Sequence, residues 1–271
     1  MLFENEEDAL AWYQSHDRVL TKDFLATIPW HEVHKTPFAS ELLPVIRYMR
    51  DVETYTPVYF DQLMQSPTGH HPAIRAFMER WVTEEPLHGE LLNRFMEEVG
   101  VPSAPTWKQD IMHHIPAGYT KIAKRNMRIA NMIGTRFTAV HMTWGAINEL
   151  QTLTGYQRLW RMAKHPVLEY ILRAIGREES KHYFFYWSIA RIRLARSGFS
   201  RALARFIIDT FWSPVGEGTK LRSETNAVIR ALFAGADGVR YVDQFVNNMI
   251  AKLPGFETST RITDRIAQAA L

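Results

Sequence analysis

Apolar residues recur at helical spacing along most of the chain, and proline and glycine residues separate the segments. The pattern predicts a first helix over residues 6–25, with Leu10, Tyr13, Leu20 and Phe24 as its apolar positions. Further helices are expected over 39–64, 72–99, 119–132, 136–163, 166–197, 201–211, 218–234 and 238–252, with a short helix or a tail from residue 258. No alternating pattern of the kind found in strands continues for more than a few residues. The sequence therefore predicts an all-α protein.

Two of these predicted helices carry the pattern Glu-x-x-His. Glu85 stands three residues before His88, and Glu179 stands three residues before His182. Residues three apart share one face of a helix, so each pair can direct a carboxylate oxygen and an imidazole nitrogen to a common point. Oxygen and nitrogen ligands of this kind suit iron or manganese.

Each Glu-x-x-His is preceded by a further glutamate at a similar distance. Glu53 lies 32 residues before Glu85, and Glu149 lies 30 residues before Glu179. A helix that rises for about 15 residues, turns and descends as far returns the chain to the same height, since each residue adds about 1.5 Å. The repeated pattern predicts two helical hairpins that form a four-helix bundle around a carboxylate-bridged di-iron centre.

Simpler interpretations exist for each of these residues. A single Glu-x-x-His on a helix also occurs as a surface ion pair or a cap. Six residues in register on four helices favour the metal site. Four other histidines lie in turn-rich segments without a suitably spaced carboxylate, and we interpret them as structural: His31, His34, His113 and His114.

Two prolines interrupt the predicted ligand helices. Pro57 cannot donate a hydrogen bond to the carbonyl of Glu53, and Pro86 cannot donate to that of Val82. Both helices are therefore expected to break or kink beside a ligand, unless the prolines simply mark helix ends. Because the apolar repeat continues from Pro57 to Leu63, a local break is the better interpretation there.

Length and composition fit one large helical domain. The chain has 271 residues, of which 46% are hydrophobic, and no linker is apparent. We predict a single domain over residues 1–271, with a bundle core over about 39–197 and accessory helices over about 200–271. The absence of cysteine excludes disulfides, thiolate zinc sites and iron-sulfur clusters. Electrons for oxygen chemistry are therefore expected from a ferredoxin or another external donor.

The chain lacks the sequence features of a membrane or secreted protein. Its first residues are acidic, where a signal peptide would be basic and then apolar. No apolar run reaches the roughly 18 to 20 residues that a membrane helix needs. We expect a cytoplasmic protein with no membrane contact.

Charge differs strongly between the two parts of the chain. Residues 1–110 hold 9 Lys and Arg against 18 Asp and Glu, and residues 111–271 hold 23 against 11. The basic part is expected to attract an acidic protein or an anionic ligand, unless its charges only solvate the surface. No nucleic-acid motif accompanies it. The candidate docking residues are Lys121, Lys124 and a cluster formed by Arg191, Arg193, Arg196, Arg201 and Arg205.

Four motifs together resemble those of the soluble acyl-ACP desaturases, ferritin-like di-iron enzymes that act on acyl chains held by acyl carrier protein (ACP). Residues 81–89, Trp-Val-Thr-Glu-Glu-Pro-Leu-His-Gly, resemble the family's Trp-x-x-Glu-Glu-Asn-Arg-His-Gly. Residues 178–182, Glu-Glu-Ser-Lys-His, resemble Asp-Glu-Lys-Arg-His, and residues 148–152, Asn-Glu-Leu-Gln-Thr, resemble Gln-Glu-Arg-Ala-Thr. Glu53 with Pro57 four residues later resembles Glu-Glu-Ala-Leu-Pro. The resemblance extends over about residues 40–200.

The resemblance implies a role for several residues. The ligands of two iron ions, with manganese as an alternative metal, would be Glu53, Glu85, His88, Glu149, Glu179 and His182. Thr152 matches a threonine near the oxygen-binding face and is the candidate catalytic residue, unless it only bonds back to its own helix. Trp81 matches a tryptophan near the metals, although a core aromatic is the better interpretation. Glu178 stands where the family has an aspartate outside the ligand set, and the family's subunits form homodimers.

The implied activity is the O2-dependent introduction of a cis double bond into an acyl chain bound to acyl carrier protein or held as another acyl thioester. Pro86 and Leu87 replace the family's Asn-Arg, which places the substrate and the redox partner in question. The alternatives are another di-iron oxygenase, such as an N-oxygenase, hydroxylase or oxidative lyase, and a ferroxidase without an organic substrate. Phe184, Phe185, Trp144 and Met142 are expected to line an acyl channel, or else to be core residues.

Overall fold

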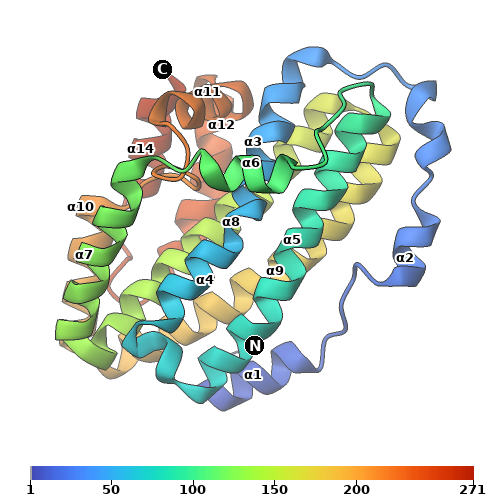
Figure 1. The fold of residues 1–271 in the computed structure, drawn as a ribbon. Helices are drawn as coiled ribbons and strands as arrows, with labels where there is room; N and C mark the ends of the chain where they lie inside the picture. The colour runs from blue at the N-terminus through green and yellow to red at the C-terminus, as the bar shows by residue number, and fades with distance from the viewer. Residues whose placement is uncertain (1) are drawn as a thin grey trace.

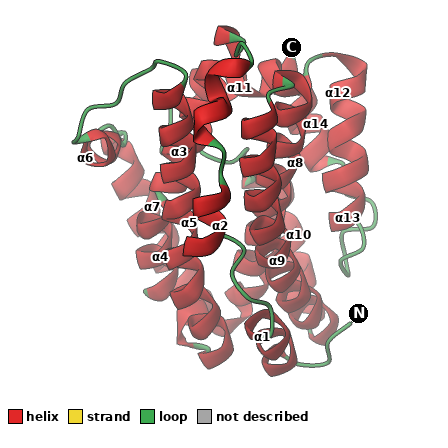
Figure 2. Ribbon diagram, turned by 90° about the vertical axis from the view of Figure 1, so that its right-hand side faces the viewer, coloured by secondary structure: helices red, strands yellow, loops and turns green. Residues whose placement is uncertain are grey.

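The computed structural model describes residues 2–271, and helices account for almost all of their regular structure (Figure 1, Figure 2). In this part of the chain the β structure is limited to an isolated bridge between Glu217 and Lys220. The all-α prediction is therefore confirmed.

Four helices form two packed pairs at the centre of the molecule. In the first pair, α3 (Leu43–Thr54) packs against α5 (Pro72–Glu98). In the second, α8 (Thr138–Ala163) packs along α9 (Pro166–Arg196). We refer to these pairs as the first and second hairpins. The predicted bounds of α5, α8 and α9 agree with the structure to within two residues at every end.

The two hairpins turn differently. In the second, Lys164 takes a left-handed conformation with φ of 48°, and the next residue, His165, caps α9 by accepting the N–H of Leu168. In the first hairpin, α3 ends one residue after Glu53, and α4 (Thr56–Met64) begins with a proline in its first turn. The break predicted beside Glu53 is confirmed.

The first predicted helix, residues 6–25, is wrong as a single element. The structure has α1 (Glu6–Gln14) and α2 (Lys22–Thr27) with an irregular segment between them. Ser15 is the C-cap of α1, and its hydroxyl donates to the carbonyl of Trp12 at 2.8 Å. The backbone N–H groups at positions 19 and 20 then donate to the Glu178 side chain instead of continuing a helix.

The remaining elements surround this core. α1 packs on α5 and α9, α10 on α8 and α9, and α11 on α3, α8 and α14. The crossover between the hairpins contains a helix that the sequence pattern did not predict, α6. The outer helices are α6 (Trp107–His113), α7 (Ala117–Ile133), α10 (Gly198–Phe211), α11 (Arg222–Phe233), α12 (Gly235–Val242), α13 (Asn248–Ile250) and α14 (Arg261–Ala270).

The core between the hairpins combines apolar packing with buried charge. Large side chains such as Phe77, Phe95 and Phe185 are fully buried, and Phe77 stacks on Phe185 with ring centroids 3.9 Å apart. Glutamate and histidine side chains are buried among them. Within residues 2–271, no helix is both long enough and apolar enough to cross a membrane.

Candidate metal centre

Six carboxylate and imidazole side chains meet inside the bundle, and they are the six that the sequence singled out as ligands. The first group of donor atoms comes from Glu53, Glu85, His88 and Glu179, and the second from Glu85, Glu149, Glu179 and His182. Within each group the donor atoms lie within 4.8 Å of one another. None of the six residues is more than 7% exposed. Because Glu85 and Glu179 belong to both groups, each can bridge two ions.

Helix geometry places these donors. Glu85 and His88 lie on one face of α5, as three-residue spacing requires. The next residue, Gly89, faces α3: a Cβ atom there would lie 3.2 Å from the carbonyl of Arg50 and 3.4 Å from the Cβ of Glu53. A larger residue at position 89 would therefore push α5 away from Glu53.

The inward-facing atoms have no hydrogen-bond partner among the described residues. These atoms are Glu85 Oε1, His88 Nδ1, both carboxylate oxygens of Glu179 and His182 Nδ1. His182 Nδ1 lies 2.8 Å from Glu85 Oε1, and His88 Nδ1 lies 3.1 Å from Glu179 Oε1, but neither contact has hydrogen-bond geometry. A buried polar atom without a partner costs about 1 to 3 kcal/mol. Metal ions between the groups would satisfy all of these atoms at once, so the residues present fit a two-metal centre.

The outer nitrogen of each histidine is held by a glutamate from the opposite hairpin. His88 Nε2 lies 3.0 Å from Glu178 Oε2, and His182 Nε2 lies 2.8 Å from Glu84 Oε2. Partners of this kind fix the tautomer and orientation of metal-binding histidines. With Nε2 occupied, each ring presents Nδ1 to the centre.

The two outer glutamates are themselves hydrogen-bonded. Glu84 accepts from the hydroxyl of Tyr13 at 2.7 Å and from Arg80 Nε at 2.8 Å. Glu178 accepts the two backbone N–H groups that interrupt the N-terminal segment, at 2.7 and 3.1 Å. The segment before the bundle therefore supports both histidines.

The charges in the centre shift the pKa values in opposite directions. Burial and the charges of Glu85 and Glu179 raise the pKa of Glu53 and of Glu149 well above the usual range. Burial acts the same way on Glu179, but the close approach and charge of the two histidines outweigh it and lower its pKa. So many buried carboxylates need positive charge nearby, which two divalent cations would supply.

Two of the residues that complete this arrangement were missed by the sequence analysis. Glu84 directly precedes Glu85 as Glu178 precedes Glu179, so the duplicated Glu-Glu pair could have revealed it. Tyr156 donates its hydroxyl to Glu53 Oε1. It lies seven residues, or two helical turns, after Glu149, a spacing that places both on one face of α8.

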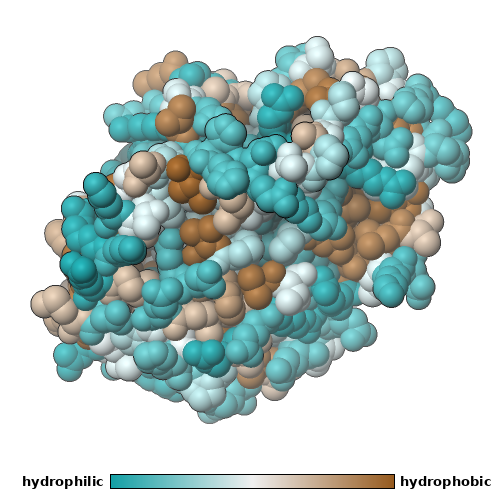
Figure 3. Space-filling view, in the orientation of Figure 1, coloured by the Kyte–Doolittle hydropathy of each residue, from teal (hydrophilic) through white to brown (hydrophobic). Residues whose placement is uncertain are grey.

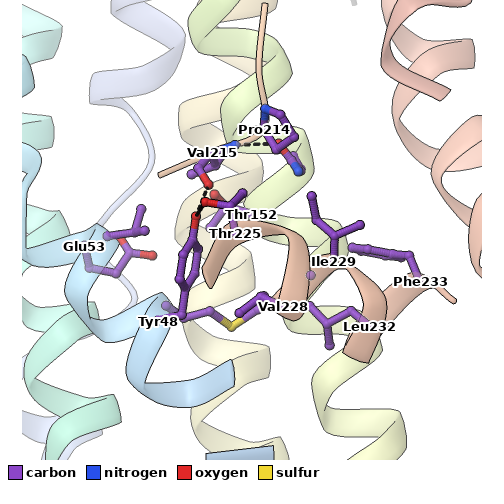
Figure 4. A pocket seen from close by; sticks show the side chains of 14 residues that line it. Tyr48, Glu53, Thr152, Pro214, Val215, Thr225, Val228, Ile229, Leu232 and Phe233 are labelled. Carbon is purple, nitrogen blue, oxygen red and sulfur yellow. Dashed lines mark hydrogen bonds between the residues drawn. The ribbon is translucent and has the colours of Figure 1, made fainter. Parts of the chain in front are cut away.

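Thr152 lies one turn after Glu149 and lines a small cavity beside the centre. This cavity has a volume of about 50 Å³, and Glu53 and Gly155 also line it. Figure 4 shows that Thr152 and Glu53 approach it from different helices. Its far wall is mainly apolar and comes from α11, through Val228, Ile229, Leu232 and Phe233. A catalytic role for Thr152 stays a prediction.

The model of the fatty acid desaturase family matches residues 50–209, more than half of the chain. The chain belongs to this family. The match covers all six candidate ligands and both Glu-x-x-His patterns. Desaturases generally use iron, and the buried groups of this desaturase family member suit a metal ion. No curated protein and no solved structure matches the chain.

Other expectations for this desaturase family member have different outcomes. Trp81 is 7% exposed and packs edge-on against Tyr186, with ring centroids 6.3 Å apart, as a core aromatic does. The four residues expected to line a channel do not line the cavity beside Glu53. Phe185, for example, is stacked on Phe77 in the core. Neither donor group includes any of the four histidines that we interpreted as structural, His31, His34, His113 and His114.

Proposed function

We propose that the protein is a ferritin-like di-iron desaturase of the acyl-ACP type, which introduces a cis double bond into a carrier-bound acyl chain in an O2-dependent reaction. One observation carries the proposal: two buried donor groups share Glu85 and Glu179, and their inward atoms lack partners, in a chain of the fatty acid desaturase family. The four carboxylates and two imidazoles leave open positions on two ions that each prefer about five or six ligands.

In this proposal the two donor groups would each hold one ion. Glu53 and His88 would hold the first ion, Glu149 and His182 would hold the second, and Glu85 and Glu179 would contribute to both. Iron bound there would supply, with O2 and two external electrons, the oxidant that removes hydrogen from an unactivated methylene. The protein orients that methylene and excludes water.

The cavity beside Glu53 and Thr152 is the proposed place for the reacting methylene. Its lining includes Met49, Val52, Val228 and Leu232, which suit a hydrocarbon. The cavity volume of about 50 Å³ is small, so the cavity as it stands admits only a short piece of chain. Binding a long acyl chain therefore requires movement of a wall, and α11 forms the wall that belongs to neither hairpin.

The small cavity favours the second candidate, another di-iron oxygenase acting on a small or carrier-bound substrate. An N-oxygenase, a hydroxylase or an oxidative lyase would use the same ligands. The two candidates differ in product. Loss of two hydrogens identifies a desaturase, and gain of one oxygen or a change on nitrogen identifies an oxygenase.

Product analysis tests the proposal directly. The iron-loaded protein would be supplied with O2, a ferredoxin with its reductase, and acyl-ACP substrates of several chain lengths, and the acyl groups analysed by mass spectrometry. We expect a product lighter by two hydrogens that contains a cis alkene. A control with Glu85→Ala and His182→Ala together should yield no product. Oxygen consumption without any change in the acyl group would indicate a ferroxidase and would contradict the proposal.

The carrier is proposed to dock on α7. This helix carries four exposed basic side chains and no acidic one: Lys121, Lys124, Arg125 and Arg128. Within residues 2–271 none of the four forms an ion pair. The surface around α7, at the left of Figure 3, is mainly hydrophilic with some hydrophobic residues among it. An acidic carrier would complement this charge.

The arginine cluster is a weaker docking candidate than the sequence suggested, because its members bind the protein itself. Arg193 pairs with the buried Glu6 at 2.7 Å, and Arg196 pairs with the same residue at 3.1 Å. Arg191 donates to the carbonyl of Phe3. These side chains fasten the N-terminal segment to α9.

Charge reversal tests α7 as the docking surface. Lys121→Glu with Lys124→Glu should weaken ACP binding at least tenfold, and added salt should weaken the wild type similarly. Lys22→Glu with Arg230→Glu, two exposed positions on α2 and α11, is the matched control and should bind as the wild type does. Equal binding by all three proteins would reject α7 as the docking surface.

Homodimer formation is likewise proposed, and sedimentation of a 31.5 kDa species at micromolar concentration would contradict it.

A further inference from the structure

Tyr156 connects the two hairpins at the metal centre. It lies on α8 in the second hairpin, is fully buried, and donates its hydroxyl to Glu53 Oε1 of the first hairpin. The other oxygen, Glu53 Oε2, lies 4.0 Å from His88 Nδ1, on the side of the first donor group. The phenol thus occupies one carboxylate oxygen and leaves the second for a metal.

No equivalent contact exists in the other half of the centre. The residue seven positions after Glu53 is Phe60, which has no hydroxyl, and the helix is broken between the two. Within residues 2–271, no tyrosine donates to Glu149, the glutamate that corresponds to Glu53 in the repeated pattern. The two halves of the centre therefore share a ligand pattern but differ in what holds the outer glutamate.

This difference matters because Glu53 lies next to the end of its own helix. α3 ends at the next residue, so Glu53 lacks the continuing turn that supports Glu149 within α8. Glu53 also lines the cavity, whereas Glu149 is not among the residues that line it. A carboxylate in this position could turn both oxygens to one ion and fill the coordination position that faces the cavity.

We propose that Tyr156 is a positioning residue that holds Glu53 with a single oxygen toward the first ion, so that this ion keeps an open position on the cavity side. The inference rests on the proposed metal centre and deepens it. On this inference, O2 and substrate would approach the ion beside Glu53. The Glu149 half of the centre would only hold its ion in place. Burial raises the pKa of the Tyr156 hydroxyl, so the group stays protonated and can donate.

Cobalt(II) binding tests the inference without any enzymatic turnover. The wild type, Tyr156→Phe and Tyr186→Phe would each be titrated with Co(II), and visible absorption, which reports coordination number, would be recorded for each bound ion. Tyr186 is the matched control because it is also a buried tyrosine, but its hydroxyl contacts the sulfur of Met78 at 3.2 Å instead of a ligand. Circular dichroism would confirm that each variant is folded.

We expect Tyr156→Phe to weaken binding of one of the two ions by about 10- to 100-fold and to change its absorption, while the second ion binds as before. Tyr186→Phe should match the wild type in both respects. Adding Tyr156→Phe to Glu53→Gln should have no further effect, because the tyrosine acts through that carboxylate.

Three results would overturn the inference. The first is that Tyr156→Phe binds both cobalt ions as the wild type does. The second is that the two tyrosine variants change metal binding equally. The third is that the double variant binds the ion more weakly than Glu53→Gln alone. If Tyr156→Phe does not fold, 3-fluorotyrosine at position 156 keeps the hydroxyl as a stronger donor, and an unchanged cobalt spectrum would then overturn it. If the wild type binds two ions and the variants behave identically, the inference fails while the metal centre stands. If the wild type binds none, the proposed function fails as well.

Discussion

The two hairpins carry the same ligand pattern on different backbones. α8 and α9 run without interruption through Glu149, Glu179 and His182. In the first hairpin, α3 stops just after Glu53, and Pro86 lies inside α5 beside Glu85. Because a proline in a helix removes a hydrogen bond, the first hairpin gives up local stability at the ligands. The cavity lies on this interrupted side, next to Glu53.

The two hairpins therefore differ in how their candidate ligands are supported. Both histidines are held by a glutamate from the opposite hairpin, His88 by Glu178 and His182 by Glu84. The outer glutamates differ. Glu149 lies within the continuous α8, whereas Glu53 lies next to the end of α3 and accepts a hydrogen bond from Tyr156.

The largest expected effect comes from removing a ligand shared by both halves. Glu179→Ala should abolish binding of both ions, because Glu179 belongs to both donor groups and contributes two oxygens without other partners. Metal analysis after refolding with ferrous iron should fall from about two ions per chain to none. Glu169→Ala, a partly exposed position on the same helix and outside both donor groups, is the control and should retain both. Full iron content in Glu179→Ala would place the site elsewhere.

Removing one histidine should separate the halves. His88→Ala is expected to lose the first ion and His182→Ala the second, each with at least a hundredfold weaker affinity for that ion. Since the first hairpin is interrupted, His88→Ala should leave the second ion nearly unaffected, and His182→Ala should also weaken the first. Calorimetric titration measures both affinities. Symmetric effects of the two substitutions would remove the proposed difference between the hairpins.

A pH-dependent contact joins the hairpins far from the ligands. His141 at the start of α8 meets the hydroxyl of Thr68 at 2.7 Å, and burial lowers its pKa to about 4. The unfolded chain, with the usual pKa of 6.5, therefore binds a proton that the folded chain does not between pH 6.5 and 4. The free energy of unfolding should fall over this window as pH is lowered, by at most about 3 kcal/mol.

Denaturant unfolding of the wild type and of His141→Gln at pH 4 and pH 7 measures this contribution. Between pH 7 and pH 4, the free energy of unfolding should fall more for the wild type than for His141→Gln. Parallel pH profiles would show that His141 is not the group that titrates.

The smallest expected effect is a gain in stability from repairing the first hairpin. Pro86→Ala restores an N–H for the carbonyl of Val82 and should raise the free energy of unfolding by about 1 to 2 kcal/mol. Leu87→Ala, next to it on α5, would lose packing and should destabilise instead. If Pro86→Ala lowers stability, the proline is accommodated without cost, and the contrast between the hairpins is weaker than we infer.

Local spacing was enough to predict which six side chains lie together as candidate ligands. Residues three apart on a helix share a face, and helices of similar length return the chain to the same height. These rules depend only on backbone geometry. They correctly brought six residues together from four helices, and they identified the break at Pro57. The rule failed over residues 6–25, where the side chain of Glu178 takes the backbone N–H groups that a helix would have used.

The sequence by itself thus determined the all-α class, the long core helices and the side chains that face the centre, because helical periodicity is a local property. The tertiary structure alone decided which distant groups support them. Glu84 and Glu178 cross between hairpins, Tyr156 reaches Glu53, and α11 closes the cavity. It also decided that Arg193 pairs with Glu6, a residue far away in the sequence. Such contacts join residues far apart in the chain, and packing in three dimensions selects them, so no spacing rule in the sequence encodes them.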